Sequence, residues 1–202
     1  MRFLAIHLAS LALAGGVVAP ADKALLARAA TVQELRLAAI SSRLAERPVA
    51  VRCGDPHSKE ALGSVLFVNG RPVDYTILAP STCTALATFA THPEQFDPST
   101  CPNGAGCPYA EQAAMALQVV SHEAYHLWGA FEEAKAECYG LQSIFYVADQ
   151  LGASLEQGKE LGRLYWTTLY RVHGTKWPKY WSPDCRNGGR LDLRPNDARW
   201  PE

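Results

Sequence analysis

The stretch SHEAYHLWGAFEEAKAECYG, residues 121 to 140, decides both the fold and the chemistry expected of this chain. It opens with the pattern His-Glu-x-x-His, formed by His122, Glu123 and His126. Side chains four residues apart lie on one face of a helix, about 6 Å apart along its axis, so two imidazoles can hold one tetrahedral metal ion. Glu123 is rotated by about 100° from His122 and can reach past such an ion to a water molecule. The pattern predicts a helix that carries a zinc site.

A catalytic zinc ion usually has three protein ligands and one open position, so a third ligand is needed. The downstream candidates are Glu132, Glu133 and Glu137. On a continuous helix Glu133 would lie about 10.5 Å along the axis from His126, which is too far for coordination. Gly129 can end the helix with a left-handed C-cap. The sequence therefore predicts that the helix breaks at Gly129 and that the chain turns back towards the metal.

The segment EAKAECYG, residues 133 to 140, resembles the Glu-x-x-Ala-Asp-Cys-type stretch that follows His-Glu-x-x-His in bacterial neutral zinc metallopeptidases. More broadly, it resembles the glutamate helix of gluzincins, and the resemblance covers residues 122 to 142. It implies a zincin-like fold in which Glu133 is the third zinc ligand. It also implies that Glu137 is the acid that hydrogen-bonds to a histidine ligand and orients it.

The chain departs from that family in two ways, and a second register therefore stays open. The gap from His126 to Glu133 is shorter than in most gluzincins, and Glu137 stands where the family has Asp. In the second register the third ligand is Glu132, because His126-x-x-Gly129-x-x-Glu132 resembles the metzincin pattern with an acid at the last position.

These residues lead to the hypothesis of a zinc-dependent endopeptidase that hydrolyses a peptide or protein substrate with Zn²⁺ as its cofactor. Glu123 is the expected general base and acid, acting on a zinc-bound water. A donor for the developing oxyanion is also needed. The conceivable donors are Tyr165, Tyr170, Arg171, His173 and Tyr180. The alternatives are a non-catalytic, disulfide-stabilised envelope binding module that keeps zinc for folding or recognition, and a protein without metal.

Residues 1 to 21 are typical of a secretory signal. Arg2 precedes an apolar stretch over residues 3 to 18, and Ala-Pro-Ala at 19 to 21 supplies a small-residue cleavage site before Asp22. Cleavage would leave one domain over residues 22 to 202. The alternative is an uncleaved amino-terminal anchor, which is the only membrane contact that the sequence predicts. Both alternatives place the protein outside the cytosol, secreted or in the cell envelope.

Composition supports one globular domain and excludes a nucleic-acid partner. Of 202 residues, 48% are hydrophobic and 19% are charged, which is enough apolar material for a single core. The formal net charge is −1, and removal of Arg2 with the signal lowers it to −2. Binding to nucleic acid needs a basic surface that such a chain does not have.

The six cysteines are an even number in an exported chain, which favours disulfide bonds. Cys101 and Cys107 bracket a five-residue Pro- and Gly-containing segment and could form a local bridge. For the others we expect the pairs Cys53–Cys83 and Cys138–Cys185.

The remaining patterns predict an α+β fold, with a small antiparallel β-sheet packed beside a mainly helical body and the His-Glu-x-x-His helix at its centre. Helical spacing favours helices over residues 22 to 45, 80 to 90, 111 to 128, 131 to 151 and 154 to 173. Asn69-Gly70 predicts a hairpin between strands at 64 to 68 and 73 to 78. By family analogy, this hairpin supplies the edge strand that binds an extended substrate.

Overall fold

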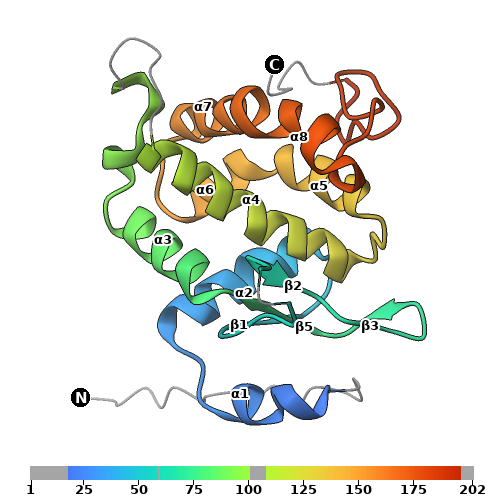
Figure 1. Ribbon diagram of the computed structural model, residues 1–202. Coiled ribbons are helices and arrows are strands. Elements are labelled where there is room, and N and C mark those ends of the chain that lie inside the picture. The colour runs from blue at the N-terminus through green and yellow to red at the C-terminus, as the bar shows by residue number, and fades with distance from the viewer. Residues whose placement is uncertain (1–17, 59, 101–107, 197–202) are drawn as a thin grey trace.

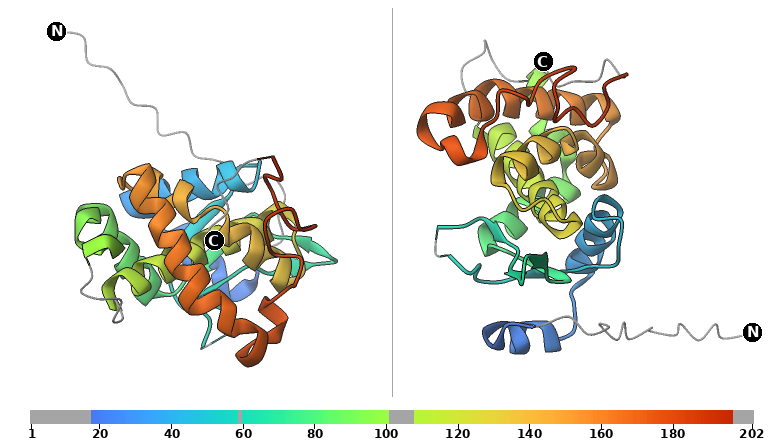
Figure 2. Two further views of the ribbon diagram at one scale, coloured as in Figure 1. Left: turned by 90° about the horizontal axis from the view of Figure 1, so that it is seen from above. Right: turned by 90° about the vertical axis from the view of Figure 1, so that its right-hand side faces the viewer.

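The computed structural model describes residues 18–58, 60–100 and 108–196. A small β-sheet separates helix α1 from a mainly helical body, as Figures 1 and 2 show from three sides. The α-helices are α1 (Lys23–Ala27), α2 (Val32–Leu44), α3 (Pro80–Thr91), α4 (Pro108–Trp128), α5 (Glu133–Leu141), α6 (Ile144–Gln150), α7 (Leu155–Tyr165) and α8 (Arg171–Lys176). The strands are β1 (Ala50–Cys53), β2 (Gly63–Ser64), β3 (Phe67–Val68), β4 (Arg71–Pro72) and β5 (Tyr75–Leu78).

The sheet differs from the predicted antiparallel one. Its order is β1-β5-β2, with β1 parallel and β2 antiparallel to β5, so the sheet is mixed. The predicted hairpin turn is confirmed, because Asn69 and Gly70 both have positive φ between the paired strands β3 and β4. The second predicted arm, however, leaves the hairpin after β4. Its residues form β5, which is buried throughout and lies between β1 and β2, as expected for a central strand.

The central helix is confirmed. Helix α4 is buried over most of its length and packs against α2, α3, α5 and α7. The long helices predicted on either side are divided. The first divides into α1 and α2, and the run from 131 to 151 divides into α5 and α6. The last continues from α7 through a π-helical segment, Trp166–Tyr170, into α8.

Glu34 joins the start of α2 to the sheet. Thr31 and Glu34 form a capping box, in which the Thr31 side chain accepts from the Glu34 amide and Glu34 accepts from the Thr31 amide at 2.8 Å. The same buried carboxylate accepts from the Cys53 amide at 2.7 Å and pairs with Arg28. Burial alone would raise the pKa of Glu34, but these donors outweigh it and hold the pKa at about 2.

We expect Glu34→Ala to lower the free energy of unfolding by about 3 kcal/mol, because it leaves the Arg28 charge and two amides without their acceptor. The pKa of Glu34 is lower in the fold than its ordinary value of 4.5. Its stabilising contribution is therefore complete above about pH 4.5 and is lost as the pH falls towards about 2. Urea titrations at several pH values check both statements. Glu94→Ala, at an exposed carboxylate, should change the free energy by less than about 0.5 kcal/mol.

Two predicted disulfides are confirmed, Cys53–Cys83 and Cys138–Cys185. Cys101 and Cys107 lie outside the described residues. The first bridge links β1 to α3, and the second links α5 to the carboxyl-terminal segment. Both are consistent with an extracytoplasmic protein. Among the described helices none is long and apolar enough to cross a membrane.

Candidate metal centre

The turn between α4 and α5 has the predicted geometry. Gly129 has a φ of +117°, and its amide donates to the carbonyls of Tyr125 and His126. The Ala130 amide also donates to the Tyr125 carbonyl, which completes a left-handed C-cap. The helix break at Gly129 is confirmed.

Helix α5 returns along α4 at close range because Gly140 has no side chain. A Cβ atom added to Gly140 would lie 2.9 Å from the backbone nitrogen of His122 and 2.9 Å from the side-chain nitrogen of Gln118. A larger residue would therefore force the two helices apart. This close approach brings the acidic residues of α5 over the histidines of α4.

His122, His126 and Glu133 converge on one point. Glu133 Oε2 lies 3.1 Å from His122 Nε2 and 3.3 Å from His126 Nε2. One ligand atom from each of the three side chains lies within 4.8 Å of the others. Both histidines are buried, whereas Glu133 is one-third exposed. The three groups could therefore hold a single metal ion that is reached from one side.

The other ring nitrogen of each histidine, Nδ1, already faces a hydrogen-bond acceptor. His122 Nδ1 lies 2.8 Å from Glu137 Oε2, and His126 Nδ1 lies 2.6 Å from the Ala130 carbonyl oxygen. Each acceptor favours a proton on Nδ1, so each Nε2 can direct a lone pair at a metal ion once it carries no proton for Glu133. Orientation of histidine ligands by such partners is usual in zinc sites. The donor set thus fits a zinc ion.

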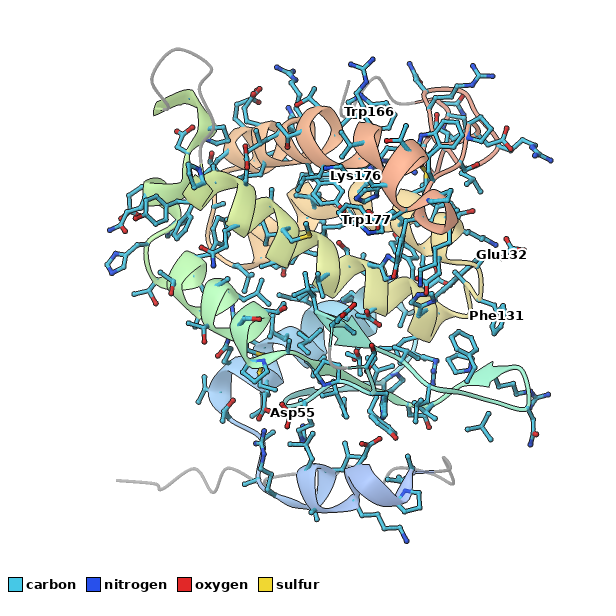
Figure 3. The ribbon with its side chains drawn as sticks, viewed as in Figure 1. Asp55, Phe131, Glu132, Trp166, Lys176 and Trp177 are labelled. Carbon is cyan, nitrogen blue, oxygen red and sulfur yellow. A yellow bond between two sulfur atoms is a disulfide. The ribbon has the colours of Figure 1, made fainter. Side chains whose placement is uncertain are left out.

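Glu132 does not join this cluster. It is the exposed N-cap residue of α5, and Figure 3 shows it at the outer edge of the molecule. Glu137 is buried behind His122 on its Nδ1 side, so it orients a histidine. Of the three candidate acids, the geometry brings Glu133 to the Nε2 atoms of the histidines.

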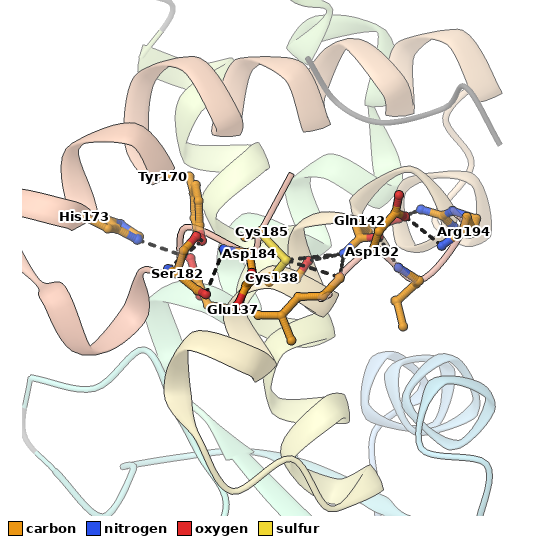
Figure 4. Close-up of a disulfide and its surroundings, with 12 residues drawn as sticks. Glu137, Cys138, Gln142, Tyr170, His173, Ser182, Asp184, Cys185, Asp192 and Arg194 are labelled. Atoms are coloured by element: carbon orange, nitrogen blue, oxygen red, sulfur yellow. Dashed lines mark hydrogen bonds and ion pairs between the residues drawn. A yellow bond between two sulfur atoms is a disulfide. The ribbon is translucent and has the colours of Figure 1, made fainter. Parts of the chain in front are cut away.

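Glu137 belongs to a buried network that the sequence did not predict. Tyr165 of α7 donates to Glu137 Oε1 at 2.5 Å, and His173 Nδ1 lies 3.5 Å from the same oxygen. The next residue, Cys138, is bonded to Cys185, so a disulfide fixes this part of α5 to the carboxyl-terminal segment (Figure 4). The sequence suggests Tyr165 and His173 only as oxyanion donors, because it does not show which side chains α7 and α8 direct at Glu137.

We expect Glu137→Gln to weaken zinc binding by about 10- to 100-fold, because an amide is a poorer acceptor for the His122 Nδ1 proton. Competition with a chromophoric chelator measures the change. Glu111→Gln, on the first turn of the same helix as the histidines, is the control and should bind zinc like the unchanged protein. Equal affinities for Glu137→Gln and Glu111→Gln would contradict the orienting role.

A cavity of about 360 Å³ opens beside His122 and Glu123. One wall consists of Leu62 and Gly63, at and before strand β2. Another wall comes from Met115 and Val119 of α4, and a third from the segment that carries His173, Trp177 and Tyr180. Its lining is mainly apolar, so charged groups inside it are poorly solvated.

Glu123 lines the cavity together with His173 and Tyr180, which are two of the five candidate oxyanion donors. Tyr165 also lines it, but its hydroxyl is committed to Glu137. The Tyr170 hydroxyl pairs with the backbone of Ser182 at 3.1 Å, and Arg171 is exposed. Of the five candidates, His173 and Tyr180 therefore stay the expected oxyanion donors.

Burial and close charges set the protonation of these groups. Burial raises the pKa of Glu123, and the nearby His122 and His126 only partly oppose it. Burial would lower the pKa of His122, but its hydrogen bonds to Glu133 and Glu137 raise the pKa to about 10. Burial would raise the pKa of Glu133, but its hydrogen bonds to His122 and His126 hold that pKa well below its usual range. A cation that binds here must therefore displace a proton.

No family model, curated protein or solved structure matches this chain. The assignment of the site therefore rests on its own geometry. The structure also changes one expectation about its surroundings. The hairpin contributes Phe67, whose ring contacts His126 and Phe131, but the strand beside Glu123 is β2. Figure 3 shows Phe131 beside the hairpin and Trp177 on the α8 side of the site.

Proposed function

We propose that this chain is an extracytoplasmic zinc-dependent peptidase, with His122, His126 and Glu133 as the zinc ligands. The observation that carries the proposal is the set of partners that the two ring nitrogens of each histidine face. Both Nε2 atoms face one Glu133 oxygen, while both Nδ1 atoms face fixed acceptors. When bound, zinc would act as a Lewis acid that polarises a carbonyl oxygen and lowers the pKa of a water molecule.

Glu123 is suited to accept a proton from this water molecule and to pass it on. It lies one residue from the first ligand, lines the cavity and is 5% exposed. Its Oε2 atom has no hydrogen-bond partner among the described residues, so this buried oxygen is available to a proton donor. A raised pKa brings the carboxyl closer to the value at which it can both accept a proton and release it to a leaving amine.

His173 and Tyr180 would donate hydrogen bonds to the carbonyl oxygen as negative charge develops there. Both line the cavity that contains Glu123, and the Tyr180 ring contacts the His122 ring at 5.9 Å between centroids. Donors placed before the reaction stabilise the oxyanion without reorganisation. An extended peptide could pair with the free edge of β2, which forms the facing wall.

Digestion of a broad peptide library by the purified, zinc-loaded protein tests the proposal. Cleavage at internal peptide bonds that stops on addition of a chelator and returns with zinc is the expected result. If the zinc-loaded protein cleaves no peptide but retains peptides when it is immobilised on a column, it is a binding module and not a peptidase.

A further inference from the structure

A second polar cluster lies on the face of the sheet opposite α4. His57 Nε2 lies 2.9 Å from Asp22 Oδ2, and His57 Nδ1 lies 2.8 Å from Ser64 Oγ. The His57 amide also donates to Ser64 Oγ at 3.2 Å. These contacts connect a residue just before α1 to the edge strand β2. We call the cluster of Asp22, His57 and Ser64 the latch.

The Asp22 end of the latch is firmly held. Asp22 is 5% exposed and accepts from the buried hydroxyl of Tyr75 at 2.5 Å. Leu25 and Leu26 of the following helix pack against Tyr75 and Ile77 of the central strand. Figure 1 shows this helix, α1, on the far side of the sheet from α4. Asp22 is thus a fixed anchor for His57.

The other face of β2 lies against the proposed general base. Successive residues of a strand point to opposite faces, so Gly63 faces α4 while Ser64 faces the latch. A Cβ atom added to Gly63 would lie 2.8 Å from both Cγ and Oε1 of Glu123 and 3.0 Å from Val119 Cγ1. A larger residue at position 63 would therefore have to displace the Glu123 side chain.

Strand β2 needs side-chain contacts in addition to its backbone hydrogen bonds to stay in place. Strand β2 has only two residues; it pairs with β5 on one side, and no strand of the described residues pairs with its other edge. A segment with so few backbone hydrogen bonds opens readily unless side chains hold it. The residues just before it, Ala61 and Leu62, line the cavity.

We infer that Asp22 and His57 are positioning residues that hold β2 and the adjoining cavity wall against Glu123 through Ser64. Their effect on turnover rests on the proposed function, whereas their effect on the strand does not. The latch sets the distance between the edge of β2, which would pair with a peptide, and the Glu123 carboxylate, which would transfer a proton during hydrolysis. A displacement of about 1 Å at such a point can lower turnover by about 100-fold.

Amide hydrogen exchange in the full chain tests the latch without any substrate. In Asp22→Ala and His57→Ala we expect the amides of residues 60 to 66 to exchange at least about tenfold faster, with the α4 amides unchanged. If Asp22→Ala and His57→Ala prevent folding, Ser64→Ala takes their place. It keeps Asp22 and His57 and should show the same local increase in exchange. His92→Ala is the matched control, because His92 also faces a carboxylate, Glu94, but at an exposed site. Unchanged exchange over residues 60 to 66 in the Ser64 and His57 variants would overturn the latch.

Kinetics and metal content separate positioning from general destabilisation. The latch predicts that kcat falls by about tenfold or more, while zinc affinity stays within about twofold, because the ligands lie on α4 and α5. Loss of zinc in parallel with activity would show that the variants act through the fold as a whole and would overturn the positioning role. If the unchanged protein cleaves nothing, the proposed function fails, and the exchange experiment still decides whether the latch holds β2.

Discussion

Replacement of Glu133 by Gln is expected to weaken zinc binding by about 100- to 1,000-fold. Structural zinc sites with four ligands bind with about 10–16 kcal/mol in total, so one ligand accounts for about 2.5–4 kcal/mol. Glu133 Oε2 lies 3.1 Å and 3.3 Å from the Nε2 atoms of His122 and His126, and an amide offers a weaker, uncharged metal ligand at the same place. Zinc competition titrations of the purified variant measure the loss.

Glu132→Gln provides the matched control, because it makes the same change one residue away. Glu132 is exposed at the N-cap of α5, outside the cluster, and its replacement should leave zinc affinity within about twofold of the original. A larger loss at Glu132 than at Glu133 would assign the third ligand to the shorter, metzincin-like register.

Replacement of Glu123 by Gln is expected to lower peptide hydrolysis by about 100- to 10,000-fold and to leave one zinc ion per chain. Gln has the shape of Glu but cannot accept the proton. The Glu123 carboxylate lines the cavity beside His122 and is not among the three grouped ligands, so metal binding should persist. Initial rates on a peptide cleaved by the unchanged protein, together with metal analysis of the same samples, check both parts.

Glu60→Gln controls for a change of charge at the same cavity. Glu60 lines the cavity but is exposed, so its replacement should change kcat by less than about threefold. Cleavage by Glu123→Gln at the rate of the unchanged protein would contradict the role of Glu123 as general base.

Local patterns predicted the parts of the fold that local interactions determine. Gly129 predicted the break between α4 and α5 because only a glycine readily adopts its positive φ. Asn69-Gly70 predicted the hairpin turn because both Asn and Gly tolerate the positive φ that such a turn requires. The mixed sheet was not predicted, because the parallel pairing of β1 with β5 joins segments about 25 residues apart and leaves no local signature.

The residues of the candidate site fall into the same two groups, those that the local sequence predicts and those that depend on packing. His122, Glu123, His126 and Glu133 lie within one short stretch, so spacing and a turn suffice to bring them together. Tyr165 reaches Glu137 from a helix 28 residues downstream, and such a contact depends on how the helices pack. The approach of Gly63 to Glu123 also depends on packing, because a lone glycine in a short strand is compatible with many environments.

The most direct test is the metal content of the full chain, purified from an oxidising compartment with its disulfides intact and measured beside His126→Ala. The proposed centre predicts one zinc ion per chain in the unchanged protein and none retained by His126→Ala after dialysis. A protein that is purified without zinc and does not bind added zinc would contradict the centre, and the peptidase proposal would fail with it.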